Sequence, residues 1–205
     1  MGADPRALPP RQRGQSMSEF IVVMPVLLLL LLGAIQFGLL YHAKGTLNLA
    51  AFEAARAGAL NQGNPAAMQL GLANGLRPLF TYSTDHGQVI SGFDTANEEV
   101  KTFARIEVVN PDAATVSAWK GRIPNGNLLY AKGTTPTGLT LQDANILKIK
   151  VTYCATLDVA LLRTVIITAA RDDSDPFLKN CYDADRLPLV AQGIVRMQSD
   201  YCPSC

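Results

Sequence analysis

The stretch EFIVVMPVLLLLLLGAIQFGLLYH, residues 19–42, decides the fold. Between Glu19 and His42 it holds 22 residues without a formal charge. As an α-helix this run would extend about 33 Å, at 1.5 Å per residue, which is enough to cross the hydrocarbon core of a bilayer. The sequence therefore predicts one transmembrane helix near the N-terminus.

The residues before this run predict its orientation. Arg6, Arg11 and Arg13 precede it, against a single Asp4. Because positive charge favours the cytoplasmic side, we expect a single-pass inner-membrane protein with a cytoplasmic N-terminus and a periplasmic C-terminal part. A secretory signal peptide fits less well, since its apolar core usually has about 7 to 15 residues and ends at a small-x-small cleavage site.

The overall composition narrows the class of partner. Eighteen basic residues balance 17 acidic ones, giving a net charge of +1. A nucleic-acid partner is not expected, because such proteins carry a basic footprint. The length of 205 residues suits one membrane helix and one folded domain.

The helical pattern continues beyond the apolar run, in KGTLNLAAFEAARAGAL at 44–60. Leu47, Ala50, Ala51, Ala54 and Gly58 fall on one helix face. The small residues at 50, 54 and 58, like Ala34 and Gly38 earlier, allow close approach of another backbone. Either the protein's own sheet or a second subunit could pack there, and the sequence leaves both open. Pro25 predicts a kink.

Later segments predict a small sheet. Alternating apolar residues mark strands at 104–109, 147–153 and 187–198, with a bulge expected at Gly193, and a helix is expected at 66–80. The fold class is therefore α+β, with a long N-terminal transmembrane helix packed against a small antiparallel β-sheet of the periplasmic domain. Residues 159–170, VALLRTVIITAA, are too short to span a bilayer; they are either buried, the favoured interpretation, or membrane-skimming.

Four cysteines fall in the part expected outside the cytoplasm, where disulfides form. The favoured pairing joins Cys154 to Cys181 and Cys202 to Cys205, but four cysteines can pair in three ways and the sequence leaves the choice open. A redox role for CPSC is disfavoured, because reactive examples sit at a helix N-terminus in a βαβ unit. Zinc is disfavoured because only one CxxC is present.

The segment RDDSDPFLKNCYDAD, residues 171–185, contains five aspartates. It lacks the DxDxDG frame of a calcium loop, so a solvated acidic loop is favoured over a calcium site. His42 and His86 are the two histidines, and neither has a local nucleophile pattern. We therefore expect no metal, no cofactor, no small-molecule substrate and no enzymatic activity.

Glu19 has a local explanation, because Ser16 and Glu19 have the spacing of a helix capping box. That explanation does not account for Gly14, which is followed by four residues, a glutamate and an apolar helix. This combination resembles the class III signal of type IV prepilins. The longer stretch GQSMSEFIVVMPVLLLLLLGAIQFGLLYHAKGTLNLAAFEAARAGA resembles the TadE family of pseudopilins of tight-adherence (Flp) pilus and secretion systems, most specifically over residues 11–60.

The resemblance implies a pilin-like fold and gives roles to Gly14 and Glu19. Prepilin peptidase would remove a basic leader, residues 1–14, by cutting between Gly14 and Gln15. Glu19 would neutralise the new N-terminal amine of a neighbouring subunit. Residues 15–61 would form the transmembrane and extended helix and 62–205 the periplasmic domain. N-methylation stays open, because Gln15 stands where type IVa pilins commonly have phenylalanine.

The length of the chain bears on its place in the pilus system, because major Flp pilins are much shorter. The resemblance therefore implies a minor or priming subunit that acts in pilus assembly and adhesion. Its partners would be the inner membrane, other pilins or pseudopilins and the assembly platform. Two alternatives remain: an uncleaved, membrane-anchored periplasmic binding module, and an anchored thiol-disulfide enzyme.

Overall fold

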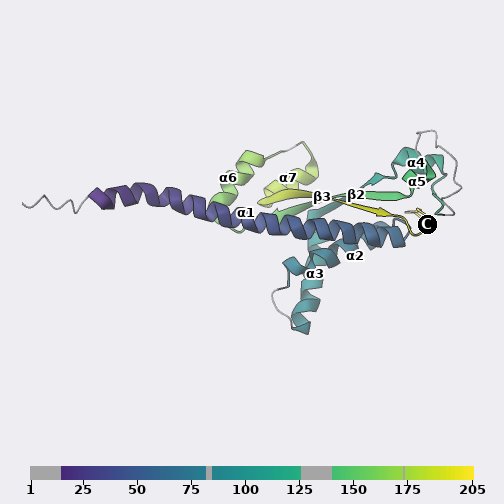
Figure 1. The fold of residues 1–205 in the computed structure, drawn as a ribbon, viewed down its shortest axis with the longest axis horizontal. Helices are drawn as coiled ribbons and strands as arrows, with labels where there is room; N and C mark the ends of the chain where they lie inside the picture. Colours follow the sequence, from purple (N-terminus) through teal and green to yellow (C-terminus); the bar gives the residue numbers. More distant parts are fainter. Residues whose placement is uncertain (1–14, 82–84, 126–139, 173) are drawn as a thin grey trace, which may run out of the picture.

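One long helix runs through the molecule and a small α+β domain is built on its C-terminal half (Figure 1). The computed structural model describes residues 15–81, 85–125, 140–172 and 174–205. Helix α1 extends over Gln15–Leu60, 46 residues, with Pro25 inside it. The prediction that the apolar helix continues past residue 42 is confirmed, whereas the kink at Pro25 stays a prediction.

Three antiparallel strands form the sheet, in the order β1-β2-β3. They are β1 (Ala104–Asn110), β2 (Ile146–Thr156) and β3 (Arg186–Arg196). All three predicted strands are confirmed. The expected bulge at Gly193 is wrong, because Gly193 pairs with Ile149 in an unbroken register. The register shifts instead in β1, between Val108 and Asn110.

Further helices follow α1 in the described part of the chain. They are α2 (Pro65–Leu76), the 3₁₀ turn η1 (Arg77–Leu79), α3 (His86–Phe103), α4 (Ala113–Ala118), α5 (Leu141–Ala144), α6 (Ala160–Ala170) and α7 (Pro176–Asp183). The predicted helix at 66–80 is confirmed as α2 and η1. Asn64 begins α2, because its side chain accepts a hydrogen bond from the Ala66 N–H at 2.9 Å.

Helix α7 corrects the expectation of an acidic loop at 171–185. Asp175 caps the helix by accepting a hydrogen bond from the Phe177 N–H at 2.9 Å, and Pro176 occupies the first helical position. Cys181 and Tyr182 on this helix are buried. Asp175 thus acts as the start signal of a short amphipathic helix.

The core lies where α1 meets α2 and the sheet. Its apolar members include Leu47, Ala50, Ala51, Ala54 and Ala55 of α1, Leu72 and Leu76 of α2, and Leu147, Ile149 and Val151 of β2. Two glycines set how closely these elements approach. A Cβ on Gly193 of β3 would overlap the carbonyl of Ala51, and one on Gly75 of α2 would overlap the backbone of Ala50. Small residues on both sides therefore let α1 lie directly on the sheet and on α2.

Candidate functional site

The N-terminal half of α1 is the candidate functional surface. Every large apolar side chain from Phe20 to Leu31 is exposed. An 18-residue window of the helix has a mean hydropathy of 2.7, and only 6% of that window is buried. The core helix of a soluble protein would have such a sequence covered by its own chain. Length, composition and exposure together indicate single-pass membrane anchoring.

Glu19 lies near the start of this exposed half and is itself exposed. It forms no ion pair with any residue that the structure describes. Ser16 lies inside α1, so the capping-box interpretation is wrong: a cap residue must precede the first helical turn. Gly14 lies outside the described residues, as does the side chain of Gln15, so the cleavage site stays a prediction.

The exposed half ends where Gln36 and Leu40 meet the domain. Gln36 is fully buried, and its Oε1 accepts a hydrogen bond at 2.8 Å from the N–H of Val159, the residue that precedes α6. Beyond it, the Lys44 Nζ donates to the carbonyl of Val190 on β3. These contacts fix the level along α1 at which the folded domain begins.

The second half of α1 answers the question left open about its small residues. Ala50, Ala54 and Gly58 are buried in the protein's own domain, and a Cβ on Gly58 would lie 2.7 Å from Met68 and 3.0 Å from Leu147. Own-domain packing is thus confirmed for this stretch. A Cβ on Gly38, in contrast, would have no atom from outside its own helical turn within 4 Å. The earlier small residues therefore remain open to another helix.

The four cysteines form two disulfides, Cys154–Cys181 and Cys202–Cys205. These are the two pairs favoured from the sequence. The first joins the central strand β2 to helix α7, and both of its cysteines are fully buried. The second closes the C-terminal CPSC, which follows the bridge between Tyr201 and Ile123 and begins no helix. Its position in the fold gives no helix dipole to activate a thiolate.

The four aspartates of 171–185 that the structure describes are engaged in local contacts. The N–H of Phe177 and the guanidinium of Arg105, 2.6 Å away, lower the pKa of Asp175. Asp183 pairs with Arg171 at 2.7 Å. Among the described residues no three His, Cys, Asp or Glu side chains are grouped to hold a metal ion, although Asp173 lies outside them.

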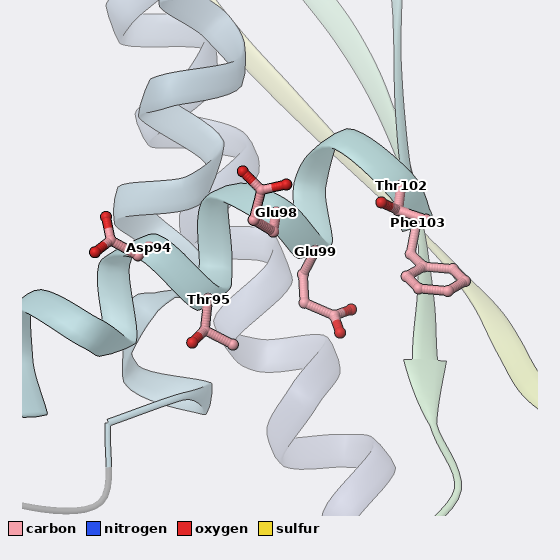
Figure 2. Close-up of a pocket in the computed structure, with 6 residues that line it drawn as sticks. All are labelled: Asp94, Thr95, Glu98, Glu99, Thr102 and Phe103. Carbon is pink, nitrogen blue, oxygen red and sulfur yellow. The ribbon is translucent and has the colours of Figure 1, made fainter.

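A shallow pocket of about 430 Å³ lies on α3 and is drawn in Figure 2. All six lining residues, Asp94, Thr95, Glu98, Glu99, Thr102 and Phe103, belong to that single helix. In Figure 2, Asp94 and Glu98 point away from Thr95 and Glu99. The carboxylates therefore do not converge on a common point, as general acid–base chemistry or ligand orientation would require.

Sequence reasoning missed α3 and the ion pair that holds it to the sheet. Arg186 of β3 bonds both oxygens of Glu99, at 2.6 and 3.1 Å, and its guanidinium lies 3.6 Å from the centroid of the Phe103 ring. Burial raises the pKa of the adjacent Tyr153 to about 12; the Glu99 charge adds to the rise and Arg186 opposes it. The cluster is structural, because each polar group is matched within the protein.

The helix itself carried a usable signal. Val89, Phe93, Ala96, Val100 and Phe103 recur at helical spacing, and Ala96 and Val100 are buried. Asp85 caps the helix by accepting from the Gly87 N–H at 3.2 Å. The ion pair had no such local signal, since its partners are 87 residues apart.

Comparison with known proteins finds a family model that matches most of the N-terminal helix. Residues 14–56 match the family model described as "TadE-like protein". No curated protein and no solved structure matches the chain significantly. The match covers the exposed half of α1 and most of its buried half, and it begins at Gly14. Residues 14–56 are thus a TadE-like segment that occupies most of α1.

Proposed function

We propose that this protein is a structural minor pilin or pseudopilin of a tight-adherence (Flp) type IV pilus or related secretion system. The observation that carries the proposal is the division of α1. Its first half is apolar and uncovered, its second half is built into a folded domain, and the TadE-like match extends over the first half and most of the second. Such a chain can insert in the inner membrane, with its N-terminus in the cytoplasm, and present the domain on the periplasmic side.

Processing would convert the membrane anchor into an assembly-competent subunit. Prepilin peptidase would cut between Gly14 and Gln15 and remove the arginines of the leader. Glu19 would then be the first charged side chain of the mature chain. A carboxylate at the edge of hydrocarbon is costly unless it is paired, and the new N-terminal amine of a neighbouring subunit is a suitable partner.

The exposed apolar half of α1 would pack among the helices of other pilins after leaving the bilayer. Gly33 and Gly38 support this step, because the structure leaves space around both positions. Small residues in a lipid-exposed helix permit close helix–helix approach. The folded domain would remain on the outer surface of the assembly, where it could contribute to adhesion.

Two variants separate processing from assembly. Gly14→Ala should leave the leader attached, because the residue next to the cleaved bond is changed. Glu19→Ala should be processed normally but should lose crosslinks between subunits, whereas Glu19→Asp, which keeps the charge, should retain part of them. The measurements are the mass of the extracted chain and the yield of crosslinked pilin complexes in cells that carry the pilus system.

Normal subunit crosslinking by Glu19→Ala would contradict the role of the carboxylate. Full-length Gly14→Ala protein that still joins the pilus complex would contradict the need for processing. The binding-module alternative predicts instead that neither variant changes function, because an uncleaved anchor needs neither residue.

A further inference from the structure

Helix α6 carries an exposed, charge-free face close to the membrane-spanning part of α1. Leu161 and Val165 are 58% and 63% exposed, and Thr164, Thr168 and Ala169 on the same side are exposed as well. Leu162 and Ile167 are buried on the opposite side. An apolar helix of this kind is either covered all round or in contact with lipid, and the domain covers only one side.

The one charged residue of α6 is turned away from that face, and the hydroxyl of Thr168 is satisfied within the helix. Its single charged residue, Arg163, pairs with Asp185 at 3.5 Å. The Thr168 hydroxyl donates to the carbonyl of Thr164 at 2.7 Å. The exposed face can therefore enter an apolar environment without burying an unpaired charge.

The depth of α6 relative to the membrane follows from its contact with α1. Val159, which precedes α6, donates to Gln36, six residues before His42 at the end of the uncharged run. Six residues correspond to about 9 Å along the helix axis. Interfacial helices lie about 5–10 Å into the boundary between headgroups and acyl chains. The start of α6 is thus at the depth expected of an interfacial helix.

The surroundings agree with this placement. Figure 1 shows α6 beside α1, on the side opposite α2 and α3 and nearer the N-terminal end of α1 than any other labelled element of the domain. Phe37 and Tyr41 of α1, at the same level, are 66% and 83% exposed. Tyrosine side chains such as that of Tyr41 are enriched at membrane–water interfaces.

We propose that the exposed face of α6, formed by Leu161, Thr164, Val165, Thr168 and Ala169, is a second membrane contact that lies in the lipid interface beside the transmembrane helix. Gln36 sets the depth of this contact by holding Val159. The membrane would then be touched at two places, α1 and α6, which restricts the tilt of the domain above the bilayer. The proposal rests on the membrane anchor alone and holds whether or not the chain joins a pilus.

Lipid, rather than a second copy of this chain, is the favoured contact of the exposed face of α6. The reason is that this face continues the surface of α1 that enters the bilayer. Contact between α1 and α6 joins the two surfaces directly. As long as α1 stays in the bilayer, a second subunit at the same place would have to displace the lipid that already surrounds α1. Protein coverage of α6 is nevertheless an outcome that the following experiment can detect.

Tryptophan quenching by brominated lipid tests the proposal on the full chain in phosphatidylcholine vesicles. Trp119 is the only native tryptophan and follows α4, far from α6 (Figure 1). Val165→Trp and Leu161→Trp each add one fluorophore on the exposed face. Ile194→Trp is the matched control, because Ile194 is 55% exposed but β3 ends beside the far end of α1, where the Gln198 N–H donates to the Ala59 carbonyl at 3.1 Å.

Phosphatidylcholine brominated on the acyl chain should remove most of the emission that Val165→Trp and Leu161→Trp add, and little of that from Ile194→Trp or Trp119. Equal quenching in all three variants would overturn the proposal. An added emission that is shifted to the blue but not quenched would also overturn it, because protein rather than lipid would then cover α6. Native Trp119 emission in each variant controls for folding.

Discussion

The two halves of α1 belong to one continuous helix but face different environments. From Phe20 to Leu31 the side chains are large, aliphatic or aromatic, and exposed. From Ala50 to Ala59 the buried positions hold alanine and glycine. The first half has bulky apolar side chains that lipid or other helices can surround. The second half has small side chains that let the sheet and α2 come close.

The comparison teaches that glycine can have opposite meanings in the two environments. A Cβ on Gly38 would meet nothing, while one on Gly193, beside the buried half, would overlap the carbonyl of Ala51. Open space at one glycine and forced contact at another cannot be distinguished from the residue type alone. Four experiments test this division between the exposed half of α1 and the folded domain.

Substituting the same residue at both glycines tests the division most strongly. Gly193→Val should lower the free energy of unfolding by about 3 kcal/mol, at the upper end of overpacking costs, because α1 cannot move away from the sheet without losing its core contacts. Gly38→Val should leave the domain's stability unchanged. Denaturant unfolding in detergent, followed by near-ultraviolet circular dichroism, measures both. Equal losses would show that the domain depends on the exposed half as well.

The packing of the folded domain can be tested at high pH through the ionisation of Tyr153. Its pKa is raised to about 12 from 10.0, so the folded state favours the protonated phenol. Stability from this group is complete below pH 10 and is lost as pH rises through 12, because the unfolded chain ionises first. The two units correspond to about 2.7 kcal/mol. Tyr153→Phe should lack this part of the pH dependence, and an identical profile for both proteins would contradict the burial of the phenol.

Removing Arg186 tests how α3 is held to the sheet. Arg186→Ala leaves Glu99 without its bidentate partner in a site where both side chains are at most 20% exposed. We expect the free energy of unfolding to fall by about 2 kcal/mol. The control Lys101→Ala removes an exposed pair with Glu98 and should cost less than about 0.5 kcal/mol. Similar values for both variants, measured by denaturant unfolding, would place the Arg186 pair among ordinary surface pairs.

A substitution of Gln36, at the boundary between the two halves of α1, should have the smallest effect on stability. Gln36→Leu removes the acceptor of the Val159 N–H, but it also removes the buried Nε2, which has no hydrogen-bond partner. The free energy of unfolding should therefore fall by only about 1 kcal/mol. Amide hydrogen exchange should rise at Val159 and along α6 but not in β2. Unchanged exchange in α6 would show that other contacts fix the start of this helix.

Local patterns were sufficient for α1 and for the three strands, since hydrophobic spacing and the length of the apolar run are properties of short segments. They failed where long-range packing decides the outcome. Gly193 was interpreted as a bulge because glycine in a strand commonly marks one, yet it serves the approach of Ala51, 142 positions earlier in the chain.

The candidate site shows the same limit. Gly14 and Glu19 stand out by their spacing before an apolar helix, and the family match begins at Gly14. The contact between Gln36 and Val159 could not be predicted, because its partners are 123 residues apart. A short-range pattern can thus mark the part of α1 that is expected to enter the membrane, but only the folded structure shows where the domain meets α1.

The most direct test of the prepilin-like account is the intact mass of the protein extracted from membranes with and without prepilin peptidase. With the peptidase the account predicts a chain that begins at Gln15, and without it a chain that begins at Met1. A chain that retains residues 1–14 in the presence of an active peptidase would contradict the account.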